Sequence, residues 1–148
     1  MATAECDYHR FRAKPIGGLK TVQRIFAEWQ RFFASLGYAW TGIRFLLTHE
    51  PNIRIHLSLA LAAILVAALL HLSPIHWGIL ILTIGFVLVT EAINTAIEVL
   101  TDLVSPEYHP QAKIVKDVAA GAVLLAAIIA IGVGLIIFLP ALIDLVAN

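Results

Sequence analysis

The residues best suited to chemistry lie in one short run, EAINTAIEVLTD, which covers residues 91–102. At about 100° per residue on a helix, Glu91, Glu98 and Asp102 fall within about 40° of one another, and Asn94 and Thr95 flank them. Carboxylates aligned in this way repel one another unless a positive charge lies among them. Their hard oxygen atoms are ligands that Mg²⁺ prefers, and Mg²⁺ commonly accompanies phosphates. The run therefore predicts a site that combines carboxylates, a metal and phosphate.

Charged residues also follow this run across a short loop. Lys113, Lys116 and Asp117 come at the start of the next apolar segment, and a lysine there is a suitable charge partner for phosphate oxygens. The alternative is that the charged residues on both sides of the loop are ordinary solvated side chains that pair and hold the helix ends together, which we favour for Lys113. Glu91 is different, because an acidic stripe that enters a membrane segment has no packing rationale. The sequence contains no GxxxxGK[ST] phosphate loop, so a bound nucleotide would not use that device.

The composition places this site in a membrane protein. Of the 148 residues, 60% are hydrophobic and 14% are charged, and the mean hydropathy is +0.90, well outside the usual range of soluble domains. No Asp, Glu, Lys or Arg lies between Arg54 and Glu91 or between Asp117 and Asp144. Both tracts are long enough to cross a bilayer core at about 1.5 Å per helical residue. Glu91 thus lies at the edge of an apolar span, where a carboxylate needs a partner, a proton or access to water.

The first tract is too long for one span and is divided at Ser73 and Pro74, where serine can cap a helix and proline suits the first turn. We predict spans over about residues 55–72, 75–90 and 118–139, with a cytoplasmic extension of the second helix to residue 104. We expect Pro140 to end the third helix. Small residues at every fourth position of the third span favour close helix contacts and an oligomer whose site is shared between subunits; they are Ala122, Ala126, Ala130 and Gly134.

The N-terminal part predicts a helix that lies on the membrane rather than across it. Between residues 19 and 50, apolar side chains recur in steps of three and four, and arginines mark the opposite face. Such a helix is suited to the membrane interface, although packing against a soluble partner would produce the same pattern. Pro51 separates it from the first span. Residues 1–18 show no periodicity, which is typical of a disordered extension, and Cys6 is the only cysteine, which excludes an intrachain disulfide.

The basic residues indicate the topology. All ten Lys and Arg residues either precede the first span or lie between the second and third, whereas the 72–76 turn and the tail after residue 139 contain none. By the positive-inside rule, the N-terminus is expected in the cytoplasm and the C-terminus outside. A signal peptide is not expected, because the first apolar run starts after residue 50. The stripe from Glu91 to Asp102 is then on the cytoplasmic side, where ATP is available.

Several segments resemble the prokaryotic diacylglycerol kinase and undecaprenol kinase family. The sequence contains an E-x-x-N-[ST]-A-I-E core in EAINTAIEVLTD, followed by EYHPQAKIVKDVAAGAVLLAA, with supporting segments GYAWTGIR and HEPNIRIH. The similarity covers roughly residues 31–139. It implies an all-α membrane protein in which an N-terminal amphipathic surface helix precedes three transmembrane helices. It also implies a homotrimer with active sites at subunit contacts, and a kinase domain over residues 19–148.

The resemblance further implies roles for individual residues. Glu91 matches the general base that takes the proton of the lipid hydroxyl, and Glu50 and Glu98 match the ligands of the Mg²⁺ bound to ATP. The positions expected to contact the nucleotide or its metal are Arg31, Tyr38, Glu50, Glu98, Glu107, Tyr108, His109, Lys116 and Asp117. Weaker candidates for binding the lipid headgroup or supporting the site are Ser35, Trp40, Asn94 and Asp102.

Together with the topology, the resemblance implies a multi-pass lipid kinase of the bacterial plasma membrane. It would transfer the γ-phosphate of Mg-ATP to the hydroxyl of undecaprenol or diacylglycerol, feeding phospholipid or cell-wall lipid-carrier metabolism, with no nucleic-acid partner. Two features depart from the family pattern. The N-terminal extension is one that the family does not need, and His56 stands where the Gram-negative diacylglycerol kinases have an acid. Together with the NIRIH and EYHP stretches, His56 tilts the choice of lipid slightly toward undecaprenol.

Two other interpretations compete with the kinase. A small oligomeric transporter or channel would use Glu91 as its coupling carboxylate, but it leaves Glu50, Lys116 and Asp117 unexplained. A catalytically inactive assembly subunit is disfavoured, because every matching catalytic position retains a competent residue.

Overall fold

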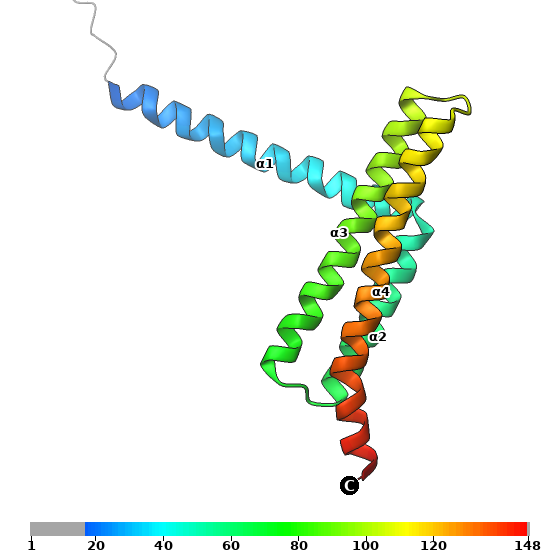
Figure 1. Cartoon of the computed structure of the whole chain (residues 1–148). Helices are drawn as coiled ribbons and strands as arrows, with labels where there is room; N and C mark the ends of the chain where they lie inside the picture. The colour runs from blue at the N-terminus through cyan, green and yellow to red at the C-terminus, as the bar shows by residue number, and fades with distance from the viewer. Residues whose placement is uncertain (1–16, 148) are drawn as a thin grey trace, which may run out of the picture. The chain divides into compact units, whose positions relative to one another are not determined.

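The computed structural model describes residues 17–147, a range that excludes most of the predicted N-terminal extension and Cys6. Within that range it consists of four helices joined by short connections: α1 (Gly17–His49), α2 (Pro51–Leu69), α3 (Pro74–Val104) and α4 (Pro110–Ala147) (Figure 1). The prediction of an all-α fold is confirmed. The chain divides into two compact units, Met1–Gly42 and Ile43–Asn148, and most of α1 belongs to the first.

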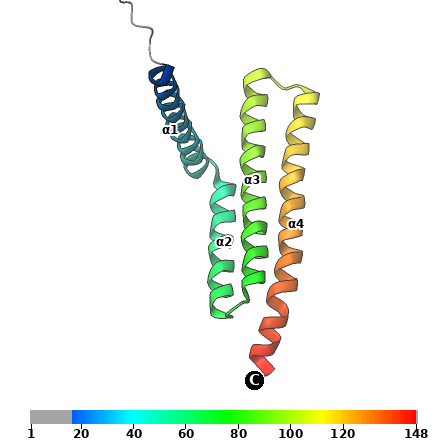
Figure 2. The same ribbon diagram turned by 90° about the vertical axis from the view of Figure 1, so that its left-hand side faces the viewer.

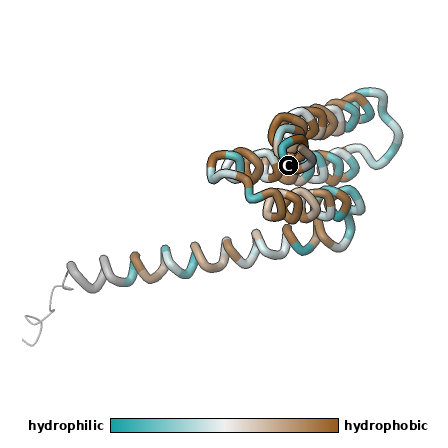
Figure 3. Tube along the Cα trace, turned by 90° about the horizontal axis from the view of Figure 1, so that it is seen from below, coloured by the Kyte–Doolittle hydropathy of each residue, from teal (hydrophilic) through white to brown (hydrophobic). Residues whose placement is uncertain are grey.

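The α1 helix matches the predicted surface helix to within two residues at each end. Its aromatic side chains gather in a cluster in which Trp29 lies 6.1 Å from both Phe32 and Phe33, measured between ring centroids. Trp29 and Phe33 are both more than half exposed. Figure 3 shows hydrophilic and hydrophobic stretches alternating along this helix. Its position in the membrane interface remains a prediction.

The junction between α1 and α2 is set by Glu50 and Pro51. The Glu50 N–H still donates to the Leu46 carbonyl at 3.0 Å, but the backbone of Glu50 is extended, with φ −101° and ψ 110°. This conformation suits a residue that precedes proline, and Pro51 then occupies the first turn of α2, where its missing N–H costs nothing. The predicted break is confirmed, and α2 begins four residues earlier than the predicted span.

The turn after α2 begins before its predicted position. Leu72 N donates to Ala67 O and His71 N donates to Ala68 O, both at 3.2 Å, and His71 has a φ of 50°. This is a Schellman motif, which satisfies the last carbonyls of a helix and needs one left-handed residue. The helix therefore ends at Leu69, three residues before the approximate end of the predicted span at residue 72.

The start of α3 follows the prediction in position but not in bonding. Ser73 is the N-cap residue by its backbone conformation and Pro74 opens the helix. The Ser73 hydroxyl does not bond to the first turn of the backbone, however, and is paired with His76 Nδ1 at 3.0 Å. The serine and proline thus mark the boundary correctly, while the side-chain cap is replaced by a contact with an imidazole.

The second unit is built around α3, which packs most extensively on α4 and less on α2 (Figure 2). On α4 the residues buried most fully are Ala119, Ala126 and Ile137. Alanines let two helices approach closely, which matters in lipid because no hydrophobic effect draws membrane helices together. Of the predicted small-residue stripe, Ala126 is buried in this seam and Ala122 is exposed, and the role of the stripe in an oligomer remains a prediction.

Enlarging Ala126 is expected to destabilise the α3–α4 hairpin. An Ala126→Leu variant places three extra carbons where 1% of the residue is exposed, which should lower the free energy of unfolding by about 1–3 kcal/mol. Ala120→Leu is the matched control, because Ala120 is an exposed alanine of the same helix and lies outside the small-residue stripe. Thermal unfolding of both variants in detergent measures the difference, and equal shifts would contradict the placement of the seam.

The helix α4 is longer than predicted at both ends. It begins at Pro110 and continues through Pro140 to Ala147, so the expectation that Pro140 ends it is wrong. Proline removes one backbone donor and crowds the carbonyl four residues earlier, but the turns on either side keep their own bonds, and membrane helices tolerate this. In the described part of the chain, three helices are long and apolar enough to cross a membrane: Pro51–Leu69, Pro74–Val104 and Pro110–Leu145.

Candidate functional site

The face of α3 that packs inward contains a polar cluster. Glu91, Asn94 and Thr95 are the buried polar or charged residues of the described chain, with 1%, 6% and 3% of their surface exposed. Glu98, one to two turns further along, is half-buried, and Asp102 is exposed. The predicted stripe therefore exists on one helix face and runs from the interior toward the α3–α4 loop.

Hydrogen bonding within the cluster is incomplete. Asn94 Nδ2 donates to Glu98 Oε1 at 3.0 Å, which links the buried part of the stripe to its half-buried part. Glu91 Oε1, Asn94 Oδ1 and Thr95 Oγ1 are buried atoms without a hydrogen-bond partner among the described residues. Leaving a buried polar atom unpaired costs about 1–3 kcal/mol, and more for a charged group. Three such oxygens within little more than one turn indicate a place built to receive a polar group.

The charged residues near the α3–α4 loop form two pairs. Lys116 Nζ donates to Asp102 Oδ1 at 2.7 Å and ties α4 to α3, whereas Lys113 pairs with Asp117 one turn along α4. The structural interpretation favoured for Lys113 is consistent with its exposed pair within one helix. Lys116 is also partnered, but an ammonium has three N–H donors and this bond uses one of them. It therefore retains the capacity to bind a phosphate oxygen.

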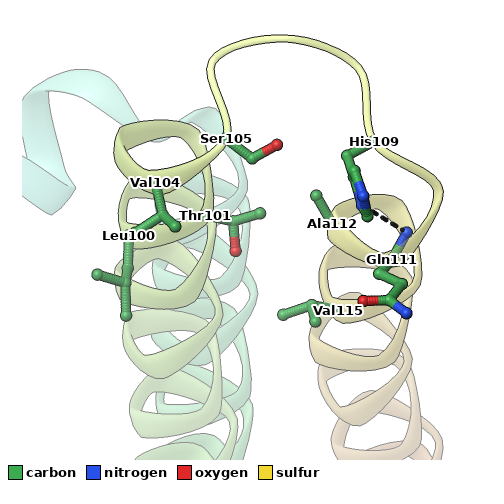
Figure 4. Close-up of a pocket in the computed structure, with 8 residues that line it drawn as sticks. All are labelled: Leu100, Thr101, Val104, Ser105, His109, Gln111, Ala112 and Val115. Carbon is green, nitrogen blue, oxygen red and sulfur yellow. Dashed lines mark hydrogen bonds between the residues drawn. The ribbon is translucent and has the colours of Figure 1, made fainter.

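A pocket of about 450 Å³ opens between the ends of α3 and α4. Figure 4 shows side chains of the two helices facing each other across it, with Thr101 and Ser105 on one side and His109 and Val115 on the other. The His109 ring accepts a hydrogen bond from the Gln111 N–H at 3.2 Å and so caps the start of α4. The Ser105 hydroxyl donates to the carbonyl of Glu107 at 3.1 Å, which holds the loop between them. Tyr108, in the same loop, is 80% exposed.

A second pocket, of about 300 Å³, lies among α2, α3 and α4 and is almost wholly apolar. Val87 and Leu88 line it, one turn deeper along α3 than Glu91, together with His56 from α2 and Ala127 from α4. It extends to Phe138, well within the apolar part of the hairpin. The α3 residues that line this cavity thus end at Leu88, three residues before the buried Glu91.

The remaining candidates lie on or near α1. Arg31, Ser35, Tyr38 and Trp40 are exposed side chains of this helix, and the Ser35 hydroxyl donates to the Phe32 carbonyl at 2.7 Å. Glu50 caps α2 by its backbone, is half-exposed, and makes no hydrogen bond with its side chain to the first turn. Its carboxylate is therefore available to a cation. The contribution of these residues to the site remains a prediction.

Comparison with known proteins decides the family. The sequence model of the prokaryotic diacylglycerol kinases matches residues 37–138, which is more than half of the chain and includes the whole polar stripe. The chain belongs to the prokaryotic diacylglycerol kinase family. The family consists of lipid kinases, and this chain has three apolar helices long enough to span a membrane. The chain is therefore a membrane enzyme of the same class. The family also implies a divalent cation, a nucleotide donor and a lipid substrate.

The similar proteins include diacylglycerol kinases and an undecaprenol kinase. The diacylglycerol kinase of Synechocystis sp. is 46% identical over 121 residues, which cover 79% of this chain and 69% of the relative. The undecaprenol kinase of Bacillus subtilis is 44% identical over 115 residues, or 78% and 94% of the two chains. The diacylglycerol kinase of Escherichia coli K12 is 33% identical over 101 residues, or 68% and 83%. The family assignment from the sequence is confirmed, and the transporter interpretation is not favoured.

Sequence reasoning left one member of the cluster without a role. Thr95 falls inside the E-x-x-N-[ST]-A-I-E core, yet nothing in a sequence distinguishes a threonine that bonds to its own helix from one that does not. Burial and the absence of a partner among the described residues are what single it out. For Lys116 the sequence left two alternatives open, namely a contact with phosphate and an ion pair that holds the helix ends together. The structure shows Lys116 paired with Asp102.

Proposed function

We propose that this member of the diacylglycerol kinase family transfers the γ-phosphate of Mg-ATP to the hydroxyl of a membrane lipid, either undecaprenol or diacylglycerol. The observation that supports this most directly is the carboxylate of Glu91, which is buried and has one oxygen unpaired among the described residues, one helical turn from the pocket residue Val87. A carboxylate in that position has an open acceptor for a proton. An apolar pocket one turn away suits the hydrocarbon chain of the lipid that would bring that proton.

The proposed reaction is a direct phosphoryl transfer. Glu91 accepts the proton of the lipid hydroxyl, the hydroxyl oxygen forms a bond to the γ-phosphorus, and the bond from that phosphorus to the oxygen it shares with the β-phosphate breaks. ADP leaves and the lipid becomes a phosphate monoester. Because only 1% of Glu91 is exposed, the reaction requires the helices around it to part locally when the lipid enters. Positioning then supplies most of the rate enhancement.

Glu98 and Glu50 are the proposed ligands of Mg²⁺. Mg²⁺ commonly binds one or two carboxylates and takes its other ligands from phosphates and water. When bound, the ion offsets the charge of the phosphates. Glu98 is oriented for this role by the amide of Asn94.

The proposed nucleotide contacts lie around the α3–α4 loop and on α1. Lys116 would use its remaining donors on phosphate oxygens, and Asp117, next to it, would act with it. His109 lines the pocket at the end of the hairpin, beside Glu107 and Tyr108. Arg31 and Tyr38 complete the proposed set from α1. Ser35, Trp40, Asn94 and Asp102 are proposed to support the lipid headgroup and the site.

Assembly and topology are part of the proposal. We infer a homotrimer in a bacterial plasma membrane, with the N-terminus in the cytoplasm, the C-terminus outside, and α1 on the membrane surface. The distribution of the Lys and Arg residues supports the topology, and the exposed aromatic cluster of α1 supports its interfacial position. The kinase domain would cover residues 19–148, with residues 1–18 as an extension.

Purified protein in mixed micelles, incubated with labelled ATP and each lipid in turn, tests the function. We expect transfer of label to one or both of undecaprenol and diacylglycerol, dependent on a divalent cation. The diacylglycerol kinase of Synechocystis sp. and the undecaprenol kinase of Bacillus subtilis are 46% and 44% identical to this chain, so sequence identity does not indicate the acceptor. The ratio of the kcat/KM values for the two lipids identifies the preferred one. A preparation that is folded and labels neither lipid would refute the proposal.

A further inference from the structure

The hydroxyl of Thr95 behaves unlike those of five other threonines whose side chains the structure describes. Each of these five donates to the carbonyl oxygen four residues earlier, at distances between 2.7 and 3.0 Å; they are Thr41, Thr48, Thr83, Thr90 and Thr101. Thr95 is more deeply buried than any of them, with 3% of its surface exposed, and its Oγ1 has no partner among the described residues.

Leaving the buried Thr95 hydroxyl without a hydrogen bond costs free energy, and a bond to the preceding turn would remove that cost. Threonine in a helix commonly bonds its hydroxyl to the preceding turn, and in an apolar interior that bond is the usual way to satisfy it. A side chain that forgoes the bond while buried loses the hydrogen bonds it would make with water and receives nothing from the protein. Valine has almost the same shape and no hydroxyl to satisfy. A threonine kept in this state is therefore explained best by a partner that arrives from outside the chain.

The neighbours of Thr95 define what that partner must offer. Glu91 lies one turn before it on the same helix face, and side chains four residues apart are neighbours on a helix. Glu91 Oε1 is an unpaired acceptor, whereas the Thr95 hydroxyl can donate. An alcohol matches both, because its O–H can donate to the carboxylate while a lone pair on its oxygen accepts from the hydroxyl. The other lone pair stays free.

We propose that Thr95 orients the acceptor lipid by donating a hydrogen bond to the oxygen of its hydroxyl group while Glu91 accepts the proton of the same group. The inference rests on the proposed function. Holding the alcohol at two points fixes the direction of its remaining lone pair, which must face the γ-phosphorus for transfer to occur. Thr95 thus belongs to the lipid side of the site, whereas the neighbouring Asn94 holds Glu98 on the metal side.

A Thr95→Val variant tests this role, with Thr95→Ser as the variant that retains the hydroxyl. We expect valine to lower kcat/KM for the lipid by about tenfold to a hundredfold and to leave KM for ATP within about twofold of its original value. Its thermal midpoint should stay the same or rise, because an unpaired buried hydroxyl has been removed. Serine should keep kcat/KM within about threefold.

The matched control is Thr90→Val. Thr90 is on the same helix and half-buried, and its hydroxyl is already bonded to the Phe86 carbonyl at 2.7 Å, so kcat/KM for the lipid should not change. A Thr95→Val enzyme with undiminished kcat/KM would overturn the inference while leaving the kinase proposal intact. So would a slow Thr95→Ser enzyme, or a fall in rate that accompanies a lower thermal midpoint. Inactivity of the unmodified protein toward every lipid would remove the proposed function and this inference together.

Discussion

Replacing Glu91 by glutamine is expected to lower kcat for lipid phosphorylation by about 10²- to 10⁴-fold, the usual contribution of a general base. Glutamine has the shape of glutamate but cannot accept a proton at neutral pH. The helices should remain folded, because a neutral amide is easier to bury than a carboxylate at a site that is 1% exposed. The measurement is a labelled-ATP assay in mixed micelles, with circular dichroism to follow the helix content and thermal midpoint.

Glu28→Gln provides the control for this variant. Glu28 is an exposed acid on α1 outside the proposed machinery, so the same chemical change there should leave kcat as it was. Retention of the full rate by Glu91→Gln would contradict the role of Glu91 as the base. If kcat fell equally in both variants, the cause would be the loss of a negative charge in general and not the removal of the buried carboxylate of Glu91.

The sequence predicts the helices of this fold well, because their signals are strong and local. Proline at the first turn of α2 and of α3, and long tracts without charge, mark elements whose existence does not depend on tertiary packing. The end of α2 is harder to predict, because its Schellman turn uses His71 rather than the usual glycine. A left-handed histidine has no clear signature in a sequence. The same is true of Pro140, which looks like a terminator but is accommodated inside α4.

The site is predictable as a set of residue types and less so as a set of contacts. Helical spacing alone brings Glu91, Glu98 and Asp102 to one face, and the structure places them there. Which of the charged residues pair depends on how α3 and α4 approach each other, and only the structure shows that Lys116 reaches Asp102. The free hydroxyl of Thr95 depends on a side-chain torsion, which no spacing rule describes.

Glu98→Ala is expected to weaken Mg²⁺ binding more than it weakens lipid binding. Removing a proposed metal ligand should raise the Mg²⁺ concentration for half-maximal rate by at least about tenfold, while KM for the lipid stays within about twofold. The assay is a Mg²⁺ titration at saturating ATP and lipid. Glu28→Ala, which removes an exposed acid from α1, should leave the titration unchanged.

A second substitution separates the charge of Glu98 from its structural contact. Glu98 Oε1 accepts a hydrogen bond from Asn94 Nδ2, and alanine removes both that acceptor and the negative charge. Glutamine at this position keeps a carbonyl oxygen that can accept the same bond, but it has no charge to offer a cation. If Glu98 binds the metal, Glu98→Gln must raise the Mg²⁺ concentration for half-maximal rate by nearly as much as Glu98→Ala does. A normal titration for the glutamine variant would mean that Glu98 serves only to hold Asn94, and the metal would then need a different ligand.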